Sequence, residues 1–119
     1  MKDISAFTKI HLALRPVDFR KGSHGLVTII KETLQCQPFE AKNLFVFVNK
    51  RKSSIRMIYW DFTGFAWWGK ALEKDKFKWP KNAGEAALLV SHRQLKWLLQ
   101  GVDLERIKVH QPVVFEKTF

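Results

Sequence analysis

The first part of the chain changes its hydrophobic period from two to nearly four. Residues 9–14 alternate Ile10, Leu12 and Leu14 with polar or small side chains, which predicts a half-buried strand. Between 23 and 34 the apolar residues recur every three to four positions, which predicts an amphipathic helix. Asp18 supplies a side-chain acceptor for a helix start, and Pro38 limits the other end.

The block 43–80 interleaves aromatic rings with cations and predicts consecutive antiparallel strands. It holds four of the five tryptophans of the chain. Strands are expected over 44–49, 54–60, 65–69 and 76–79, joined by turns. A sheet this aromatic can be a packed core, a stacking platform for bases or a docking face. Because the rings fall on both sides of the strands, we expect most of them to be core.

The last patterned region combines an apolar run with a helix start signal. Residues 86–90 predict a further strand or extended segment, and Ser91 with Gln94 matches the capping box. The helix that follows is expected to end at Gln100, before Gly101. The predicted fold is α+β: an antiparallel sheet of four or five strands with two helices packed mainly on one face. The other face would then be covered by the C-terminal tail, a second subunit or a partner, so a homo-oligomer is one of the alternatives.

The length of 119 residues predicts one domain, 1–119, with a core over about 9–103 and a C-terminal extension over 104–119. The net charge of +10 and the pI of about 10.0 favour polyanionic partners, with nucleic acid first and anionic membranes second. With Cys36 as the only cysteine, no intrachain disulfide can form. The chain shows neither a signal peptide nor an apolar run that could span a bilayer. We therefore expect a cytoplasmic protein with no membrane association.

Three groups of cations are candidate DNA contacts. The first is the predicted hairpin tip and its flank, the second is the lysine-rich run after the third strand, and the third is a predicted helix start, where anions are favoured. Solvated turns and ordinary strand alternation explain the same patterns without DNA. The candidate DNA-binding residues are Arg20, Lys21, Lys50, Arg51, Lys52, Arg56, Lys74, Lys76 and Lys78.

Trp97 departs from the apolar stripe of the second helix. Leu95, Leu98 and Leu99 form that stripe, and Trp97 falls nearly opposite, near the cations Arg93 and Lys96. An exposed tryptophan among cations is a candidate partner-binding hot spot. The alternative is a helix packed on two sides.

No set of residues predicts catalysis. The four histidines, His11, His24, His92 and His110, lack metal-ligand spacing, and Cys36 has no histidine nearby in sequence. Several converging carboxylates would be needed for two-metal nuclease chemistry, and only Asp18 and Asp61 adjoin distinctive residues. We expect no enzyme activity, catalytic residue, metal or cofactor, and keep a small nuclease using these two aspartates as a minor alternative.

The chain contains five distinctive blocks: Pro16-Val17-Asp18-Phe19-Arg20-Lys21-Gly22, Leu44-Phe45-Val46-Phe47 with Asn49-Lys50-Arg51, Met57-Ile58-Tyr59-Trp60-Asp61 with Gly64-Phe65 and Trp68, Leu72-Glu73-Lys74 with Phe77-Lys78-Trp79-Pro80, and Gln94-Leu95-Lys96-Trp97-Leu98-Leu99-Gln100-Gly101. These blocks resemble the TnpB accessory proteins of insertion-sequence (IS) family 66 transposable elements. The resemblance covers roughly residues 9–103, and its Tyr-Trp-Asp and Phe-x-Trp-Pro blocks are the most specific. Phe19 replaces the usual methionine, and Ser53 stands where a glycine is common.

The resemblance implies a non-catalytic accessory protein for transposition of a bacterial mobile element, acting beside a separate transposase. It supplies a biological process and no catalytic residues. Together with the basic charge it leads to the hypothesis of a DNA-binding accessory protein. The alternative is a protein–protein adaptor that recruits or stabilises the transposase of the same element.

Overall fold

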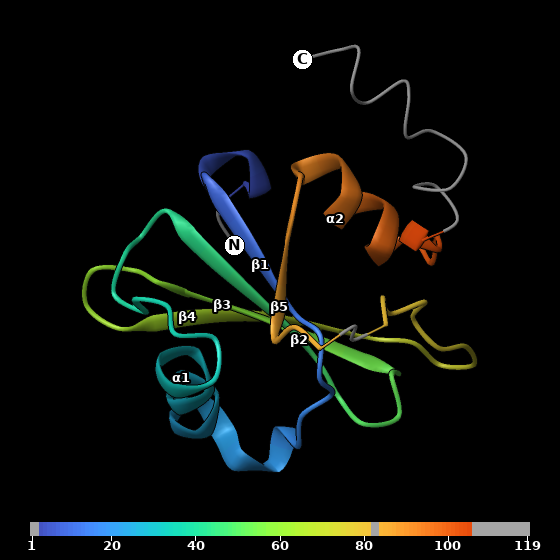
Figure 1. Cartoon of the computed structure of the whole chain (residues 1–119), viewed down its shortest axis with the longest axis horizontal. Helices are drawn as coiled ribbons and strands as arrows, with labels where there is room; N and C mark the ends of the chain where they lie inside the picture. Colours follow the sequence, from blue (N-terminus) through green and yellow to red (C-terminus); the bar gives the residue numbers. More distant parts are fainter. Residues whose placement is uncertain (1–2, 82–83, 106–119) are drawn as a thin grey trace.

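The computed structural model describes residues 3–81 and 84–105 (Figure 1). Five strands and two α-helices make up most of this region, together with two single 3-10 turns. The elements in chain order are η1 (Ile4–Ala6), β1 (Lys9–Ala13), η2 (Phe19–Lys21), α1 (Gly22–Glu32), β2 (Asn43–Val48), β3 (Ser54–Trp60), β4 (Phe65–Ala71), β5 (Ala87–Val90) and α2 (His92–Leu99).

The strands form one sheet in the order β4-β3-β2-β1-β5. β1 and β2 run parallel, joined by α1, because a parallel pair needs a crossover connection. The other three pairs are antiparallel. The predicted α+β class is confirmed, and the one parallel pair is the departure from an all-antiparallel sheet.

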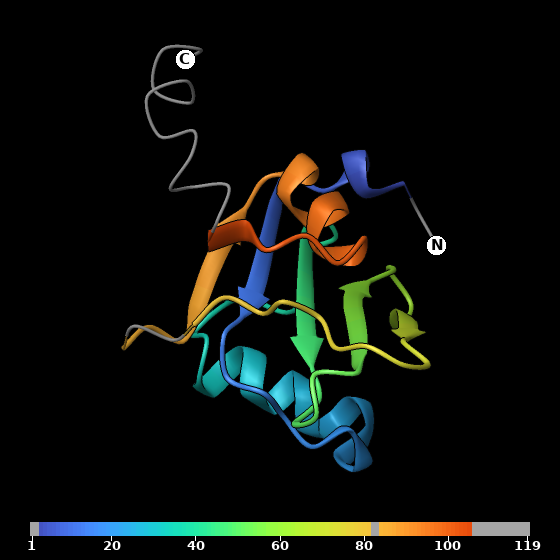
Figure 2. The same cartoon turned by 90° about the vertical axis from the view of Figure 1, so that its right-hand side faces the viewer.

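The two helices lie on opposite faces of the sheet, which corrects the expectation that both pack mainly on one face (Figures 1 and 2). Leu26 and Ile30 of α1 pack with Phe45 and Phe47, whereas α2 packs on the side of Leu44 and the other β2 residues of that face. β2 is therefore buried along its whole length. Hydrophobic periodicity showed which side of each helix is apolar, but it carries no information about which sheet face the helix meets.

The residues 72–80, here called the strap, leave β4 and cross the sheet toward β5 (Figure 2). Phe77 and Trp79 are buried in the α2-side core, and the Trp79 indole N–H donates to the Ala13 carbonyl at 2.9 Å. The expected strand at 76–79 is wrong, because this segment joins no ladder. The alternation of buried rings and exposed lysines is real, and an extended segment lying on a sheet produces it as well as a strand does.

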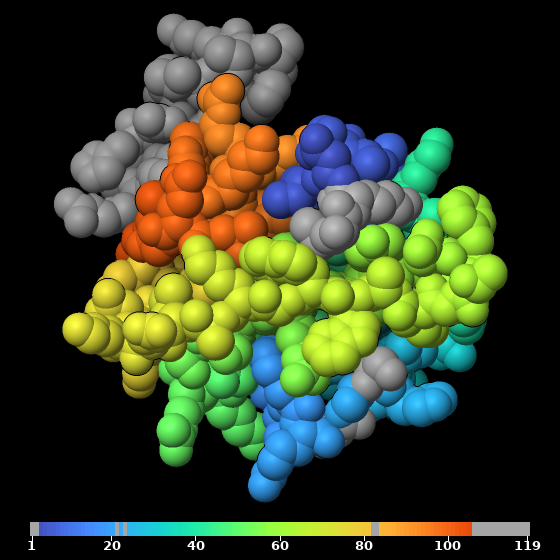
Figure 3. All heavy atoms as spheres, turned by 180° about the vertical axis from the view of Figure 1, so that it is seen from behind, coloured from blue at the N-terminus to red at the C-terminus, as the bar shows by residue number. Residues whose placement is uncertain are grey.

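One end of the sheet is defined here because the candidate site lies there. β1, β2 and β4 finish at the same end, where β3 begins, since Val48 pairs with Ile55 and Ala71 with Ser54. We call this the basic end. Viewed from behind, β4 and the strap run across the middle of the molecule, between α2 and the start of α1 (Figure 3).

Two further predictions concern membrane-spanning helices and the C-terminal extension. Neither of its α-helices has the length and apolar run needed to cross a bilayer. The extension predicted over 104–119, including His110, lies outside the described residues after Glu105.

Candidate nucleic-acid interface

Asn49 builds the β2–β3 hairpin tip at the basic end. Its side-chain Oδ1 accepts hydrogen bonds from the Ser53 and Ser54 amides at 2.9 and 3.0 Å. Its carbonyl accepts from the Lys52 amide at 3.0 Å, and Lys52 adopts a positive φ of 60°. These bonds hold the turn closed, so that the side chains of Lys50, Arg51 and Lys52 are all exposed. The sequence analysis placed Asn49 at the end of a strand and the start of the turn but did not assign its side chain a role, although Asn is a favoured residue for organising turns.

The β1–α1 connection forms the second part of the basic end. Asp18 caps η2 by accepting from the Arg20 amide at 2.9 Å, which confirms its expected role at a helix start. The Arg20 guanidinium also lies 2.8 Å from the Asp18 carboxylate. These hydrogen bonds from Arg20 hold the pKa of Asp18 well below its usual range. Gly22 then takes a φ of 72°, a left-handed conformation that favours glycine.

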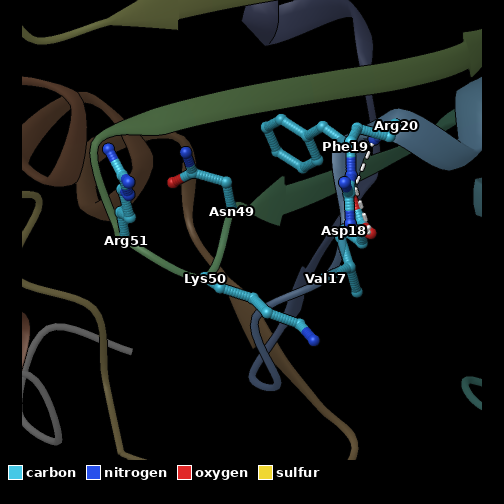
Figure 4. A pocket seen from close by; sticks show the side chains of 7 residues that line it. All are labelled: Val17, Asp18, Phe19, Arg20, Asn49, Lys50 and Arg51. Atoms are coloured by element: carbon cyan, nitrogen blue, oxygen red, sulfur yellow. Dashed lines mark hydrogen bonds and ion pairs between the residues drawn. The ribbon is translucent and has the colours of Figure 1, made fainter.

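The hairpin tip and this connection face each other across an open concavity of about 500 Å³ (Figure 4). A bridge between Val17 and Asn49, with the Val17 amide donating to Val48 at 2.9 Å, joins the two segments. Lys50 extends toward the Val17 side of the concavity, and Arg51 lies on the other side of Asn49 in this view. Cations separated by about thirty positions along the chain therefore line one opening: Arg20, Lys50 and Arg51.

Arg56 lies behind this opening rather than in it. Its guanidinium carbon is 4.8 Å from the centre of the Phe19 ring and 4.5 Å from that of Trp67. One guanidinium nitrogen donates to the Phe19 carbonyl at 3.1 Å. The half-buried side chain thus fastens β3 and β4 to the β1–α1 connection, so its charge is already engaged.

The strap lysines continue the basic end onto the α2 side. The Phe77 amide donates to the Lys52 carbonyl at 2.8 Å, which fixes the strap against the hairpin tip. Lys76 and Lys78, on either side of Phe77, are exposed and line a second concavity of about 390 Å³ with the end of α2. Lys70 adds its ammonium there, 3.0 Å from the Leu99 carbonyl. Lys74 is also an exposed residue of the strap.

The candidate partner-binding residues occupy α2 and line neither of the two concavities described above. Trp97 is half-buried and packs against the α2-side core, as expected for a helix packed on two sides. The Arg93 guanidinium lies 6.0 Å from the centre of its ring, and Arg93 and Lys96 are exposed. Part of the indole therefore remains accessible beside these cations.

The carboxylates proposed for a nuclease do not meet. Asp18 follows β1 at the basic end, whereas Asp61 follows β3, which runs antiparallel to β2 and so finishes at the opposite end. The nuclease alternative on these two residues is therefore wrong. Over residues 3–81 and 84–105, no three His, Cys, Asp or Glu side chains gather as a metal would require.

The fold brings Cys36 next to His11, which lies 25 positions away in the sequence. Cys36 Sγ lies 3.7 Å from His11 Nδ1, and the other ring nitrogen of His11 lies 3.4 Å from Asn43 Oδ1. This order of thiol, imidazole and amide can activate a thiol for nucleophilic attack. Burial instead raises the pKa of the Cys36 thiol and lowers the pKa of His11. Both effects favour the neutral forms, so the trio is a packed polar contact rather than an activated nucleophile.

One family model and two individual proteins are similar in sequence to this chain. The model of a family described as IS66 Orf2 like protein matches residues 8–109. The uncharacterized protein y4jC of Sinorhizobium fredii (strain NBRC 101917 / NGR234) is 38% identical over 100 residues, covering 84% of both chains. The uncharacterized protein y4hO of the same strain is 33% identical over 95 residues, covering 80% of this chain and 81% of its own. No solved structure matches significantly.

Proposed function

The chain belongs to the IS66 Orf2-like family, whose members are accessory proteins of insertion sequences, and we propose that it acts in transposition by binding DNA through the basic end of its sheet. The observation that carries this proposal is the shared concavity. Arg20 and the hairpin cations Lys50 and Arg51 come from distant parts of the chain and line one opening. Charge that served only solubility could be spread over the whole surface, so its concentration around one opening favours a binding role.

The character of the site favours contacts to the phosphate backbone. Arg20, the tip cations and the strap lysines are exposed side chains, and such groups follow a polyanion without reading its sequence. We assign phosphate contacts to the tip, to η2 and to the strap, and leave Arg56 out because the rings of Phe19 and Trp67 enclose it. The proposed contacts are Arg20, Lys21, Lys50, Arg51, Lys52, Lys74, Lys76 and Lys78.

The test is the salt dependence of binding to a fluorescent DNA duplex, measured by anisotropy. Affinity should fall steeply between 50 and 200 mM salt. The double variant Lys50→Ala/Arg51→Ala should bind more weakly and should reduce the slope of log K against log salt by about two, roughly one per lost phosphate contact.

The matched control removes two cations from the other end of the sheet. Lys9 and Lys42 are exposed, and they lie where β1 and β2 begin. Lys9→Ala/Lys42→Ala lowers the net charge equally and should leave the slope almost unchanged. Equal losses in both double variants would show that DNA responds only to net charge and would refute the assigned interface.

A second candidate function, an adaptor for the transposase of the same element, is favoured by accessible aromatic rings that line neither basic concavity. Trp97, flanked by Arg93 and Lys96, is one. Phe39 and Phe62, with 46% and 76% of their surfaces exposed, are others. Capture of the transposase that survives nuclease treatment and is lost in Trp97→Ala would support the adaptor role, and capture abolished by nuclease would assign it to DNA.

A further inference from the structure

β4 is an edge strand whose outer backbone is unpaired within the described part of the chain. Its inner side pairs with β3 over seven residues, and β4 ends the strand order. The Asp61 amide donates to Gly64, and the Leu72 amide donates to Ser53, both at 2.8 Å. Antiparallel pairs alternate between bonded and non-bonded, so these two bonds fix which residues face β3. The N–H and C=O groups of the alternate residues point outward: Phe65, Trp67, Gly69 and Ala71.

This edge lacks the features that usually block edge-to-edge pairing. Proline, a bulge or charges on the outer side would do so. β4 contains one charged residue, Lys70, and its ammonium is held on the α2 side by the Leu99 carbonyl. Trp67 meanwhile keeps 54% of its surface exposed, on a strand that crosses the middle of the face in Figure 3.

The edge is complementary to a second copy of itself. Because alternate residues share a face, Phe65, Trp67, Gly69 and Ala71 present two rings followed by two small residues on the α1 side. An antiparallel pairing centred on Trp68 sets Trp67 opposite Gly69 of the partner subunit and Phe65 opposite Ala71 of the partner subunit. Each ring then covers a position with little or no side chain, as aromatic residues do for glycines in sheets.

We propose that the protein forms a two-fold dimer through β4, which joins two sheets into one. All the outward N–H and C=O groups of the four residues then pair across the axis, and the exposed Trp67 rings become buried. On the α1 side this register places a ring against a small residue at each of the four positions, which a parallel or shifted pairing would not do. The proposal does not rest on DNA binding, and it is tested in the absence of DNA.

Sedimentation of the full chain over a range of concentrations tests the dimer. The unchanged protein should show a reversible monomer–dimer equilibrium. Trp67→Thr removes the ring, and Gly69→Pro removes one outward N–H without touching the β3 ladder. A Cβ at Gly69 meets its nearest atom, the Ile55 carbonyl oxygen, at 3.5 Å, which is ordinary contact. Each variant should raise the dimer dissociation constant at least tenfold.

The control Leu89→Thr removes an exposed apolar side chain from the other edge strand, β5, where Leu89 is 60% exposed. It should leave the dimer intact. Thermal unfolding checks that each variant is folded, and hydrogen exchange gives a readout on the unchanged chain. The amides of Phe65, Trp67, Gly69 and Ala71 should exchange more slowly as concentration rises. A monomer at all concentrations, a dimer lost only in Leu89→Thr, or a dimer in which these amides stay fast would overturn the proposal.

Discussion

Asp18 both shapes the basic end and opposes its function. Its carboxylate caps η2 and holds the Arg20 guanidinium at 2.8 Å, which places a negative charge inside the concavity proposed for DNA. Asp18→Asn keeps an oxygen acceptor for the Arg20 amide, removes the negative charge and frees Arg20. Affinity for duplex DNA should therefore rise by about two- to tenfold, with a steeper salt dependence. Asp61→Asn makes the same charge change at the opposite end, and an equal gain there would contradict the assignment.

His11 makes the stability of the fold depend on pH. Burial lowers its pKa below the ordinary 6.5, although the nearby Asn43 amide opposes that shift. The unfolded chain therefore binds a proton more readily, and the folded state loses stability as pH falls through 6.5. Urea unfolding between pH 5 and 7.5 should show a smaller loss toward acid in His11→Gln than in the unchanged protein. An unaltered pH dependence in the variant would show that His11 is not the responsible group.

The strap is an element without secondary structure that closes one face of the sheet. Trp79 is its deepest anchor, because its indole N–H donates to the buried Ala13 carbonyl at 2.9 Å. Trp79→Phe keeps an aromatic ring but removes this hydrogen bond, which should cost about 0.5–1.5 kcal/mol of unfolding free energy. Phe62→Leu, at a position 76% exposed, is the control and should cost much less. Denaturant unfolding measures both, and equal costs would show that the strap does not need this bond.

Local patterns predicted those elements whose cause is local. The Ser91–Gln94 capping box is present at the start of α2, and β3 has the predicted bounds, because side-chain acceptors and strand alternation act over a few residues. The strap escaped the same reasoning, since burial of Phe77 and Trp79 alternates whether or not the backbone joins a ladder. Whether a partner strand lies beside a segment is decided by the rest of the fold.

At the scale of the whole molecule, the candidate site could be predicted in its residues but not in its arrangement. Composition and spacing identified the tip, the η2 cations and the strap lysines as separate groups. Only the parallel β1–β2 pair brings Arg20 beside Lys50 and Arg51, and only the strap's bond to Lys52 brings Lys76 and Lys78 to the same end. Arg56 belonged to the same basic sequence, yet the fold encloses its charge between two rings.

The β4 dimer and the basic end together predict that one assembly holds two DNA duplexes. A two-fold axis at Trp68 reverses the strand direction between copies, so the two basic ends would point in opposite directions along the joined sheet. With a biotinylated duplex on beads, the unchanged protein should retain a second, fluorescent duplex. Gly69→Pro, which leaves the net charge unchanged, should bind one duplex as before but lose this retention. Lys50→Ala/Arg51→Ala should weaken both activities while remaining dimeric. Retention that persists in a monomeric Gly69→Pro protein would mean that a single chain bridges DNA, with the β4 edge playing no part.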